Sequence, residues 1–265
     1  MAALHEGLRD DAAIAADALA LRAAWKAGRL GGAVMPEDAH PPLEPASDQL
    51  AAYFTLGMSL NYQRNSFALW RACTALFEAE PWAFDPAAVT RAAPERLAAA
   101  LLHHRVALQP SRHPAIWARN AAGLVRHAGG SVRALFERAG WDLAAVRTIL
   151  QAHKPDFPYL CGPKLANYWL HVMSSYMDWP LVGRAALSVA PDRHVIAAAI
   201  ELGLVAAEDA SPERVAVRWA EVAARAGLAP IDLHTPLWLW SRAGFPPPGN
   251  LSRSPSLAAD RVDAR

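Results

Sequence analysis

The spacing of apolar residues along this chain predicts helices almost throughout, because apolar positions recur every three to four residues and no convincing alternating stretch occurs. Residues 65–80 show the pattern clearly, with Trp70, Cys73 and Phe77 at the spacing of one buried helix face. Capping residues, prolines and glycines divide the rest of the chain. We therefore expect an all-α protein, with helices over residues 4–30, 47–58, 65–80, 94–104, 114–127, 131–139, 142–152, 163–177, 192–202, 211–225 and 231–242.

Proline and glycine clusters suggest how these helices are grouped. Residues 1–46 are predicted to hold an N-terminal helix and a proline-rich link, residues 47–244 the main helical domain, and residues 245–265 a flexible tail. No repeat of fixed period is present. We expect two packed helical lobes with a cleft between them.

Composition favours a globular protein in a reducing compartment. Apolar residues make up 53% and charged residues 19% of the 265 residues. No apolar run reaches the roughly 18 residues needed to span a bilayer, and the N-terminus lacks a secretory pattern. The two cysteines, Cys73 and Cys161, are too few for a four-cysteine iron–sulfur cluster or an all-cysteine zinc site. We expect a cytoplasmic protein without a membrane partner.

The charge is distributed unevenly although its sum is only +1. Residues 91–154 carry ten Lys or Arg against three acidic residues, which leaves the rest of the chain at about −6. A basic region of this kind attracts polyanions such as DNA. A set of solvated helix faces would give the same pattern, so charge leaves both interpretations open.

Two residues are candidates for chemistry, although each also has a structural explanation. Lys164 follows Gly-Pro at the start of an apolar helix, where a lysine is commonly a surface charge. Asp192 follows Pro191 and begins another helix, where an aspartate commonly serves as an N-cap. The sequences around the two residues therefore have to decide between function and structure.

Those sequences resemble the helix-hairpin-helix superfamily of DNA glycosylases. Residues 160–167 read Leu-Cys-Gly-Pro-Lys-Leu-Ala-Asn, similar to the Leu-Pro-Gly-Val-Gly-x-Lys-Thr-Ala-Asn hairpin of the endonuclease III branch, and Lys164 matches its lysine. Asp192 begins Asp-Arg-His-Val, similar to Asp-Thr-His-Val in that branch. The resemblance covers residues 141–204 well and implies a helix-hairpin-helix element with its hairpin at residues 153–164.

Several departures favour one branch of the superfamily. The cluster cysteines are absent, and 28 residues separate Lys164 from Asp192, more than in the endonuclease III branch. Both features, and Leu-His-Thr-Pro-Leu-Trp at residues 233–238, are similar to the archaeal 8-oxoguanine DNA glycosylases. His234 stands where that branch has an acid, and Leu160 replaces the first hairpin glycine, so the turn is expected to differ from the standard one.

The resemblance implies a role for each matched residue. Lys164 would attack C1′ of the damaged nucleotide as a free amine, expel the base and form a Schiff base, from which β-elimination cuts the strand. The N-terminus of a helix disfavours the ammonium form. Asp192 would stabilise the developing oxocarbenium charge. Contacts with the DNA backbone would come from Gly162, Cys161, Lys154 and His194.

A glycosylase also holds the extruded base between apolar faces. Tyr168 lies one helical turn beyond Lys164, and the archaeal branch has an aromatic residue there. Trp238 matches the stacking tryptophan of that branch, and His234 and Gln63 complete the implied pocket. Core packing would equally explain the two aromatic residues, and structural hydrogen bonding is the better interpretation of Gln63.

The expected partner is double-stranded DNA containing an oxidised base, bound by a monomer associated with the nucleoid. No cofactor is expected. Metal is not expected either, because the histidines at 103, 104, 113, 127 and 153 lack the His-x-x-x-His and His-Glu-x-x-His spacings of zinc enzymes. Two other functions remain open: a nucleoside N-glycosidase similar to queuosine-salvage enzymes, and a non-catalytic helix-hairpin-helix module that binds DNA.

Overall fold

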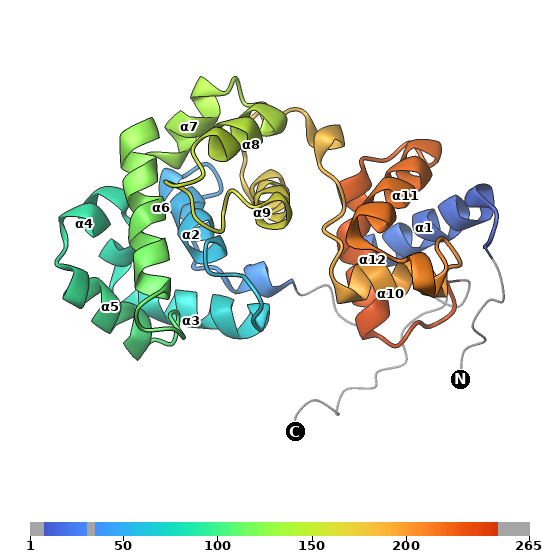
Figure 1. Cartoon of the computed structure of the whole chain (residues 1–265), viewed down its shortest axis with the longest axis horizontal. Helices are drawn as coiled ribbons and strands as arrows, with labels where there is room; N and C mark the ends of the chain where they lie inside the picture. The colour runs from blue at the N-terminus through green and yellow to red at the C-terminus, as the bar shows by residue number, and fades with distance from the viewer. Residues whose placement is uncertain (1–7, 31–34, 249–265) are drawn as a thin grey trace. The chain divides into compact units, whose positions relative to one another are not determined.

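The computed structural model describes residues 8–30 and 35–248, and this part of the chain is all-α (Figure 1). Helices account for 65% of the described residues, which contain no sheet. An isolated parallel bridge joins Asp142 to Val182. The prediction of an all-α fold is confirmed.

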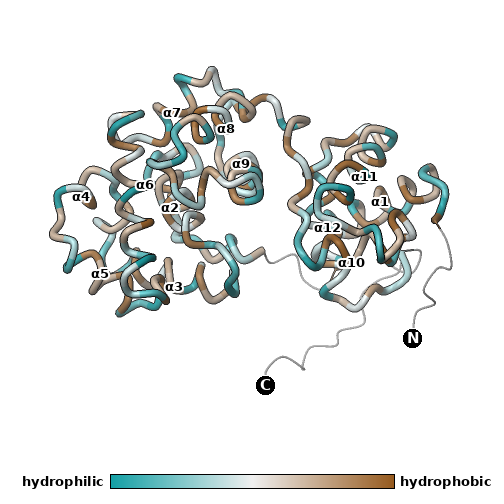
Figure 2. The backbone as a smooth tube through the Cα atoms, viewed as in Figure 1, coloured by the Kyte–Doolittle hydropathy of each residue, from teal (hydrophilic) through white to brown (hydrophobic). Residues whose placement is uncertain are grey.

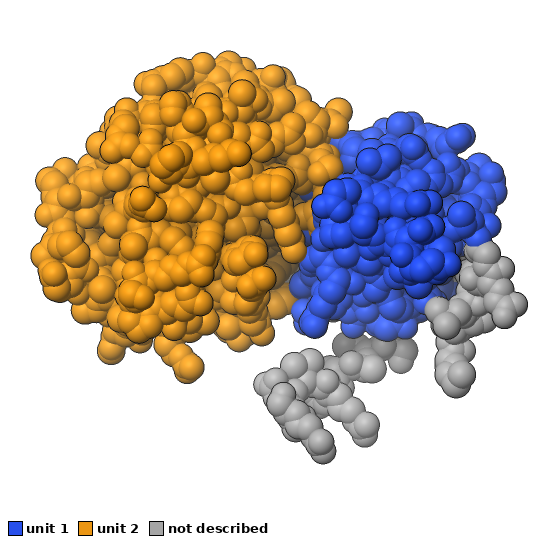
Figure 3. Space-filling view, in the orientation of Figure 1, with its two compact units in different colours: residues 1–33, 191–265 blue, residues 34–190 orange. Residues whose placement is uncertain are grey.

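The chain divides into two compact units, drawn in different colours in Figure 3. Unit 1 combines residues 1–33 with residues 191–265, and unit 2 comprises residues 34–190. The helices of unit 1 are α1 (Asp11–Lys26), α10 (Arg193–Glu201), η4 (Ala207–Asp209), α11 (Pro212–Arg225), η5 (Pro230–Leu233) and α12 (His234–Arg242). Those of unit 2 are η1 (Pro36–Ala39), α2 (Asp48–Met58), α3 (Ser66–Ala79), η2 (Pro81–Phe84), α4 (Pro86–Arg91), α5 (Pro94–His103), α6 (His113–Ala128), α7 (Val132–Arg138), α8 (Leu143–Ala152), α9 (Pro163–Tyr176) and η3 (Arg184–Ala186).

Helix α2 forms the centre of unit 2. It packs against α3, α6, α7 and α9, and Figure 1 shows it between α6 and α9. Every residue from Leu50 to Met58 is buried, as expected of a helix that is apolar on all sides. Gly57 allows α3 to approach, because a Cβ atom there would lie 2.7 Å from the Trp70 ring.

The proline-rich segment, which we expected to be a link, is folded into unit 2. Its η1 turn is fixed by Tyr176, whose hydroxyl donates to Asp38 at 2.6 Å, and by Thr74, whose hydroxyl donates to the Ala39 carbonyl. The Trp179 indole donates to the carbonyl of Ala46 at 3.1 Å. These contacts explain why the chain does not divide at residue 46.

The N-terminal helix likewise has no domain of its own, because it completes the core of unit 1. Helix α1 packs against α11 and α12 and buries Ile14 and Leu21 completely. Asp11 forms an ion pair with Arg218 of α11 at 2.5 Å. An amphipathic helix must bury its apolar stripe somewhere, and here the C-terminal helices provide the partner surface.

Most expected helices are present, with shifts at their ends. Helix α1 begins at Asp11 rather than at residue 4, since Asp10 caps it; residues 4–7 lie outside the described residues. The expected helix over 231–242 is the η5 turn followed by α12. The sequence pattern missed α4, a helix of six residues capped by Asp85.

The segment expected to be a flexible tail begins as ordered structure. Phe245 packs edge-on against Trp240, with ring centroids 4.8 Å apart, and the Trp240 indole donates to the Pro246 carbonyl at 2.7 Å. Residues 249–265 of the expected tail lie outside the described residues. The fold of unit 1 therefore includes residues 245–248, which follow the end expected at residue 244.

Hydrophobic and hydrophilic residues both recur along the helices in Figure 2, as expected of amphipathic helices. Among the described residues, none of the helices combines the length and the apolarity that crossing a membrane requires.

Candidate functional site

Lys164 is the second residue of α9, directly after Pro163 and the N-cap residue Gly162. Its side chain is exposed and, within the described residues, forms no hydrogen bond or ion pair. The helical hydrogen bonds of α9 begin with the N–H of Ala166, which donates to Gly162 at 2.8 Å. The first turn therefore presents the Lys164 amine beside N–H groups that have no partner within the helix.

We call the loop before α9 the hairpin loop (residues 153–162). It has leucine instead of glycine at position 160, and its left-handed residue lies elsewhere. Leu160 is fully buried, and the left-handed backbone conformation falls on Tyr159, with φ of 64°. This conformation costs a non-glycine residue about 1–2 kcal/mol. The Tyr159 ring contacts Tyr62 at 5.1 Å between centroids and lies 5.1 Å from the Arg112 guanidinium carbon. These ring contacts stabilise the turn.

Three backbone N–H groups of the hairpin loop form hydrogen bonds within the loop itself. Those of Leu160, Cys161 and Gly162 donate to carbonyl oxygens of the loop at 2.8, 2.9 and 3.0 Å. A phosphate near this turn would therefore meet the first turn of α9 rather than Cys161 and Gly162, to which the resemblance assigned this contact. Burial raises the pKa of the Cys161 thiol, and Lys154 is exposed at the other end of the loop.

Helix α6 anchors the hairpin loop at close range. Asn120 is fully buried, and its side-chain amide donates to the Pro158 carbonyl at 3.0 Å. At Gly123, a Cβ atom would lie only 2.7 Å from the Asp156 carbonyl oxygen and 3.0 Å from the Phe157 ring. The loop that precedes Lys164 thus rests on backbone with little room to move.

We expect Gly123→Ala to destabilise the protein by about 1–3 kcal/mol, because the added methyl group collides with backbone. The higher helix propensity of alanine, about 1 kcal/mol, acts in the opposite direction and is smaller. Urea unfolding of the variant measures the balance. Ala122→Gly, at the neighbouring position of α6, is the control for helix propensity alone. Greater stability of the Gly123 variant would show that the loop yields easily.

A buried acid, which was not among the candidate residues, binds a side chain on the face of α9 that carries Lys164. Glu37 of η1 is 1% exposed and accepts two hydrogen bonds, from the Trp70 indole at 2.8 Å and from the Tyr168 hydroxyl at 3.1 Å. Tyr168 is half-buried and lies one turn beyond Lys164. Glu37 therefore fixes an aromatic side chain next to the lysine.

Burial raises the pKa of Glu37 from 4.5 to about 7, against the opposing effect of its hydrogen bonds. Because the folded state binds this proton more tightly than the unfolded state, the stabilisation is complete below pH 4.5 and is lost as the pH rises to about 7. A shift of this size corresponds to about 3 kcal/mol.

We expect Glu37→Gln to remove this contribution and to make the protein more stable than wild type at pH 8. Denaturant unfolding at pH 5 and pH 8 gives the change of the unfolding free energy with pH for wild type and for the Glu37 variant. Glu44→Gln, which changes an exposed glutamate of the same segment, should retain the wild-type slope. Equal pH dependence in wild type and the Glu37 variant would contradict the assignment.

Polar groups continue along α9 from Tyr168. The ring of His171, a buried residue, lies 5.9 Å from the Tyr168 ring. The Arg184 guanidinium lies 3.3 Å from Nδ1 of His171 and donates to the Ser174 hydroxyl. Lys164, Tyr168 and His171 therefore share one face of α9, as residues four and three positions apart must.

Asp192 belongs to unit 1, where it caps α10. One carboxylate oxygen accepts the N–H groups of His194 at 2.9 Å and Val195 at 3.0 Å. The prediction that Asp192 is an N-cap is confirmed. Its second oxygen accepts no hydrogen bond from the described residues, so the capping role does not use the whole carboxylate.

Two further residues of the implied site lie together in unit 1. The rings of His194 and Trp238 are 5.8 Å apart, and the Arg242 guanidinium carbon lies 4.7 Å from the Trp238 centroid. His194 Nδ1 contacts the Ser241 hydroxyl at 3.1 Å. Burial lowers the pKa of His194. The start of α10 and the exposed side of α12 therefore form one polar and aromatic cluster.

His234 and Gln63 are placed differently from the other candidates. His234 is buried at the start of α12, 5% exposed. Gln63 is exposed in the loop between α2 and α3, with φ of 50°. That loop is held by Arg64, which donates to the carbonyl oxygens of Val106 and Arg105 at 2.6 and 3.2 Å. Arg64, rather than Gln63, therefore forms the structural hydrogen bonds of this loop.

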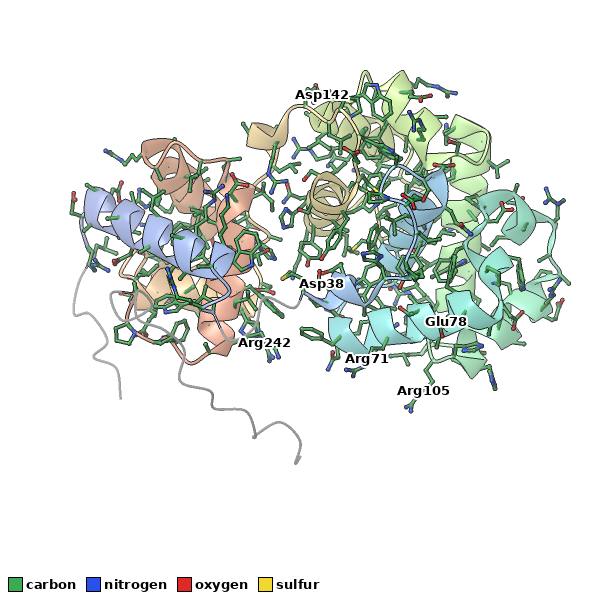
Figure 4. The ribbon with its side chains drawn as sticks, turned by 180° about the vertical axis from the view of Figure 1, so that it is seen from behind. Asp38, Arg71, Glu78, Arg105, Asp142 and Arg242 are labelled. Carbon is green, nitrogen blue, oxygen red and sulfur yellow. The ribbon has the colours of Figure 1, made fainter. Side chains whose placement is uncertain are left out.

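The basic stretch, residues 91–154, covers α5 to α8 of unit 2. Nine of its ten Lys and Arg residues are exposed, and Arg105 extends from the surface in Figure 4. Arg126 and Arg133 form ion pairs with Asp156 and Glu137. Most of this charge therefore faces solvent, which agrees with either interpretation of the charge pattern.

The structure thus forms two clusters of candidate residues: Lys164, Tyr168 and Glu37 in unit 2, and Asp192, His194 and Trp238 in unit 1. No protein-family model matches this chain, and no curated protein does.

Proposed function

We propose that this protein is a bifunctional DNA glycosylase and AP lyase that removes an oxidised purine, 8-oxoguanine, from DNA. The observation that carries the proposal is the setting of Lys164. It is an exposed amine in the first turn of α9, directly after an anchored hairpin loop and one turn before a fixed tyrosine. The resemblance of the surrounding sequence to helix-hairpin-helix glycosylases supplies the reaction.

In the proposed reaction, the unprotonated Lys164 amine attacks C1′ and the bond from C1′ to the base breaks with its electron pair on the base. The nitrogen on C1′ then gives one proton to the departing base, and opening of the sugar ring, in which O4′ takes up a proton from solvent, leaves a protonated Schiff base. Removal of a C2′ proton then expels the 3′ phosphate, which cuts the strand by β-elimination.

The proposal gives Asp192 the task of stabilising positive charge that develops on the sugar. Its carboxylate has the required property, because one oxygen suffices for the cap and the other accepts nothing from the described residues. Asp192 can therefore accept the N–H groups of the helix with one oxygen and stabilise positive charge on the sugar with the other.

An aromatic side chain would hold the extruded base, and Tyr168 and Trp238 are the two candidates. Tyr168 is half-buried and fixed through its hydroxyl by Glu37, and Trp238 is half-buried beside His194. Rings that are already oriented lose less conformational freedom when a base stacks on them. The exposed arginines of the basic stretch would supply sequence-independent attraction to the phosphates.

Borohydride trapping tests the proposal directly. The full-length protein is incubated with a duplex containing one 8-oxoguanine and, in parallel, with the same duplex containing guanine or an abasic site. Borohydride reduces the Schiff base and leaves a covalent protein–DNA adduct. We expect adducts with the 8-oxoguanine and abasic duplexes and none with the guanine duplex.

The alternatives give different results in the same assay. A protein that binds DNA without chemistry would shift the duplex in a gel and form no adduct on any of the three. A nucleoside N-glycosidase would release free base from a mononucleoside and leave the duplexes intact. Either outcome would exclude the lyase.

A further inference from the structure

Three side chains outside the proposed site converge where α6 meets the hairpin loop. His127 lies in the last turn of α6, and His153 and Asp156 lie at the start of the loop. One possible ligand atom from each, a ring nitrogen or a carboxylate oxygen, lies within 4.8 Å of the other two. The imidazole rings are stacked, with centroids 4.0 Å apart and an angle of 28° between them.

Asp156 is held on both sides in this cluster. His127 Nε2 lies 2.8 Å from one carboxylate oxygen, and Arg126 pairs with the other. The contact between His127 and Asp156 is one that a metal ion can replace, because imidazole nitrogen and carboxylate oxygen are both common zinc ligands.

We propose that His127, His153 and Asp156 form a binding site for a divalent transition-metal ion that favours imidazole ligands, with Zn²⁺ as its representative. Two imidazoles and one carboxylate are a ligand set found in zinc sites that keep a fourth position for water. The proposal is independent of the glycosylase function, since none of the three residues belongs to the proposed reaction.

The required movement is small. A tetrahedral zinc ion with bonds of about 2.0 Å sets its ligand atoms about 3.3 Å apart. The distance from His127 to Asp156, 2.8 Å, would lengthen slightly, while the widest pair, within 4.8 Å, would close by at most about 1.5 Å. We expect the His153 ring to rotate out of the stack, and no hydrogen bond of its side chain to the described residues opposes this rotation.

Arg126 keeps a defined position next to such an ion. It binds the carboxylate oxygen of Asp156 that faces away from His127, and so it can orient the ligand without competing for the same atom. Metal binding here would add His153 to the links that already join α6 to the hairpin loop, which are the contacts of Asp156 with Arg126 and His127 and the Asn120 hydrogen bond. We therefore expect the bound metal to hold the loop that leads to Lys164 more rigidly.

The site is tested by titrating metal-free, full-length protein with Zn²⁺ against a chromogenic chelator, and by Co²⁺ absorption, which reports tetrahedral coordination. We expect one ion per chain with a dissociation constant in the micromolar range or below, and at least a tenfold weaker constant for His153→Ala. That variant keeps the pair of His127 and Asp156. Its thermal unfolding without metal should match that of wild type.

His104→Ala is the matched control. His104 also contacts a histidine ring, that of His103 at 4.9 Å, but belongs to no group of three metal-binding side chains among the described residues. Wild-type affinity in the His104 variant together with weakened affinity in the His153 variant supports the site. No stoichiometric binding by wild type, or equal affinity in both variants, overturns it. Adduct formation is measured separately and decides only the proposed function.

Discussion

Replacement of Lys164 by alanine is expected to abolish the borohydride-trapped adduct, with a loss of lyase activity on the order of 10³-fold or more because the nucleophile is gone. The fold should be unaffected. The side chain is exposed and makes no hydrogen bond or ion pair with the described residues, and alanine is a good helix former. Thermal unfolding within about 0.5 kcal/mol of wild type would confirm this.

The chain contains only three lysines, Lys26, Lys154 and Lys164, so every candidate side-chain amine can be tested singly. Lys154→Ala is the closest control, because this residue is an exposed lysine at the other end of the hairpin loop. We expect it to weaken DNA binding modestly and to form the adduct normally. An adduct that persists in the Lys164 variant would assign the nucleophile to another lysine or to the N-terminal amine.

Asp192→Asn is expected to lower excision of 8-oxoguanine by roughly 10²- to 10⁴-fold while leaving stability nearly unchanged. Asparagine caps helices about as well as aspartate, so the hydrogen bonds to His194 and Val195 should survive the loss of the charge. Asp192→Ala removes both properties and should cost about 1 kcal/mol of stability in addition.

Comparison of the two variants separates chemistry from capping. Base excision and thermal unfolding are measured for both on the same duplex. If only the alanine variant lost activity, in proportion to its stability, Asp192 would be a cap and nothing more. Trapping on a preformed abasic site gives a second readout. It should be impaired less than excision, because no base has to leave.

Local sequence was sufficient to predict much of the secondary structure. Asp192 was expected to cap a helix and does so, and Lys164 and Tyr168 were expected on one face of a helix and lie one turn apart on α9. Capping and the period of 3.6 residues act between neighbours in the chain, so they can be read from the chain. The functional roles of these residues stay predictions.

Features that depend on contacts between residues far apart in the chain were predicted less well. The proline-rich segment looked like a link because its own residues cannot form a regular helix, yet Thr74, Tyr176 and Trp179 bind it to unit 2. Glu37, in the same segment, was not among the candidate residues. Its burial depends on Trp70 and Tyr168, which lie 33 and 131 residues away in the chain. Nothing in the local pattern indicates such partners.

The sequence by itself determined the all-α character, most helix positions, and the placement of Lys164 and Asp192 at helix starts. Only the tertiary structure decided that α1 completes unit 1, that Glu37 supports Tyr168, and that His127, His153 and Asp156 converge. No metal site was predicted, because the histidines lack the spacings of zinc motifs that lie on one helix. A site formed by residues from separate elements has no such spacing in the sequence. Helix formation depends on contacts within a few residues, whereas burial and side-chain convergence depend on which distant surfaces meet.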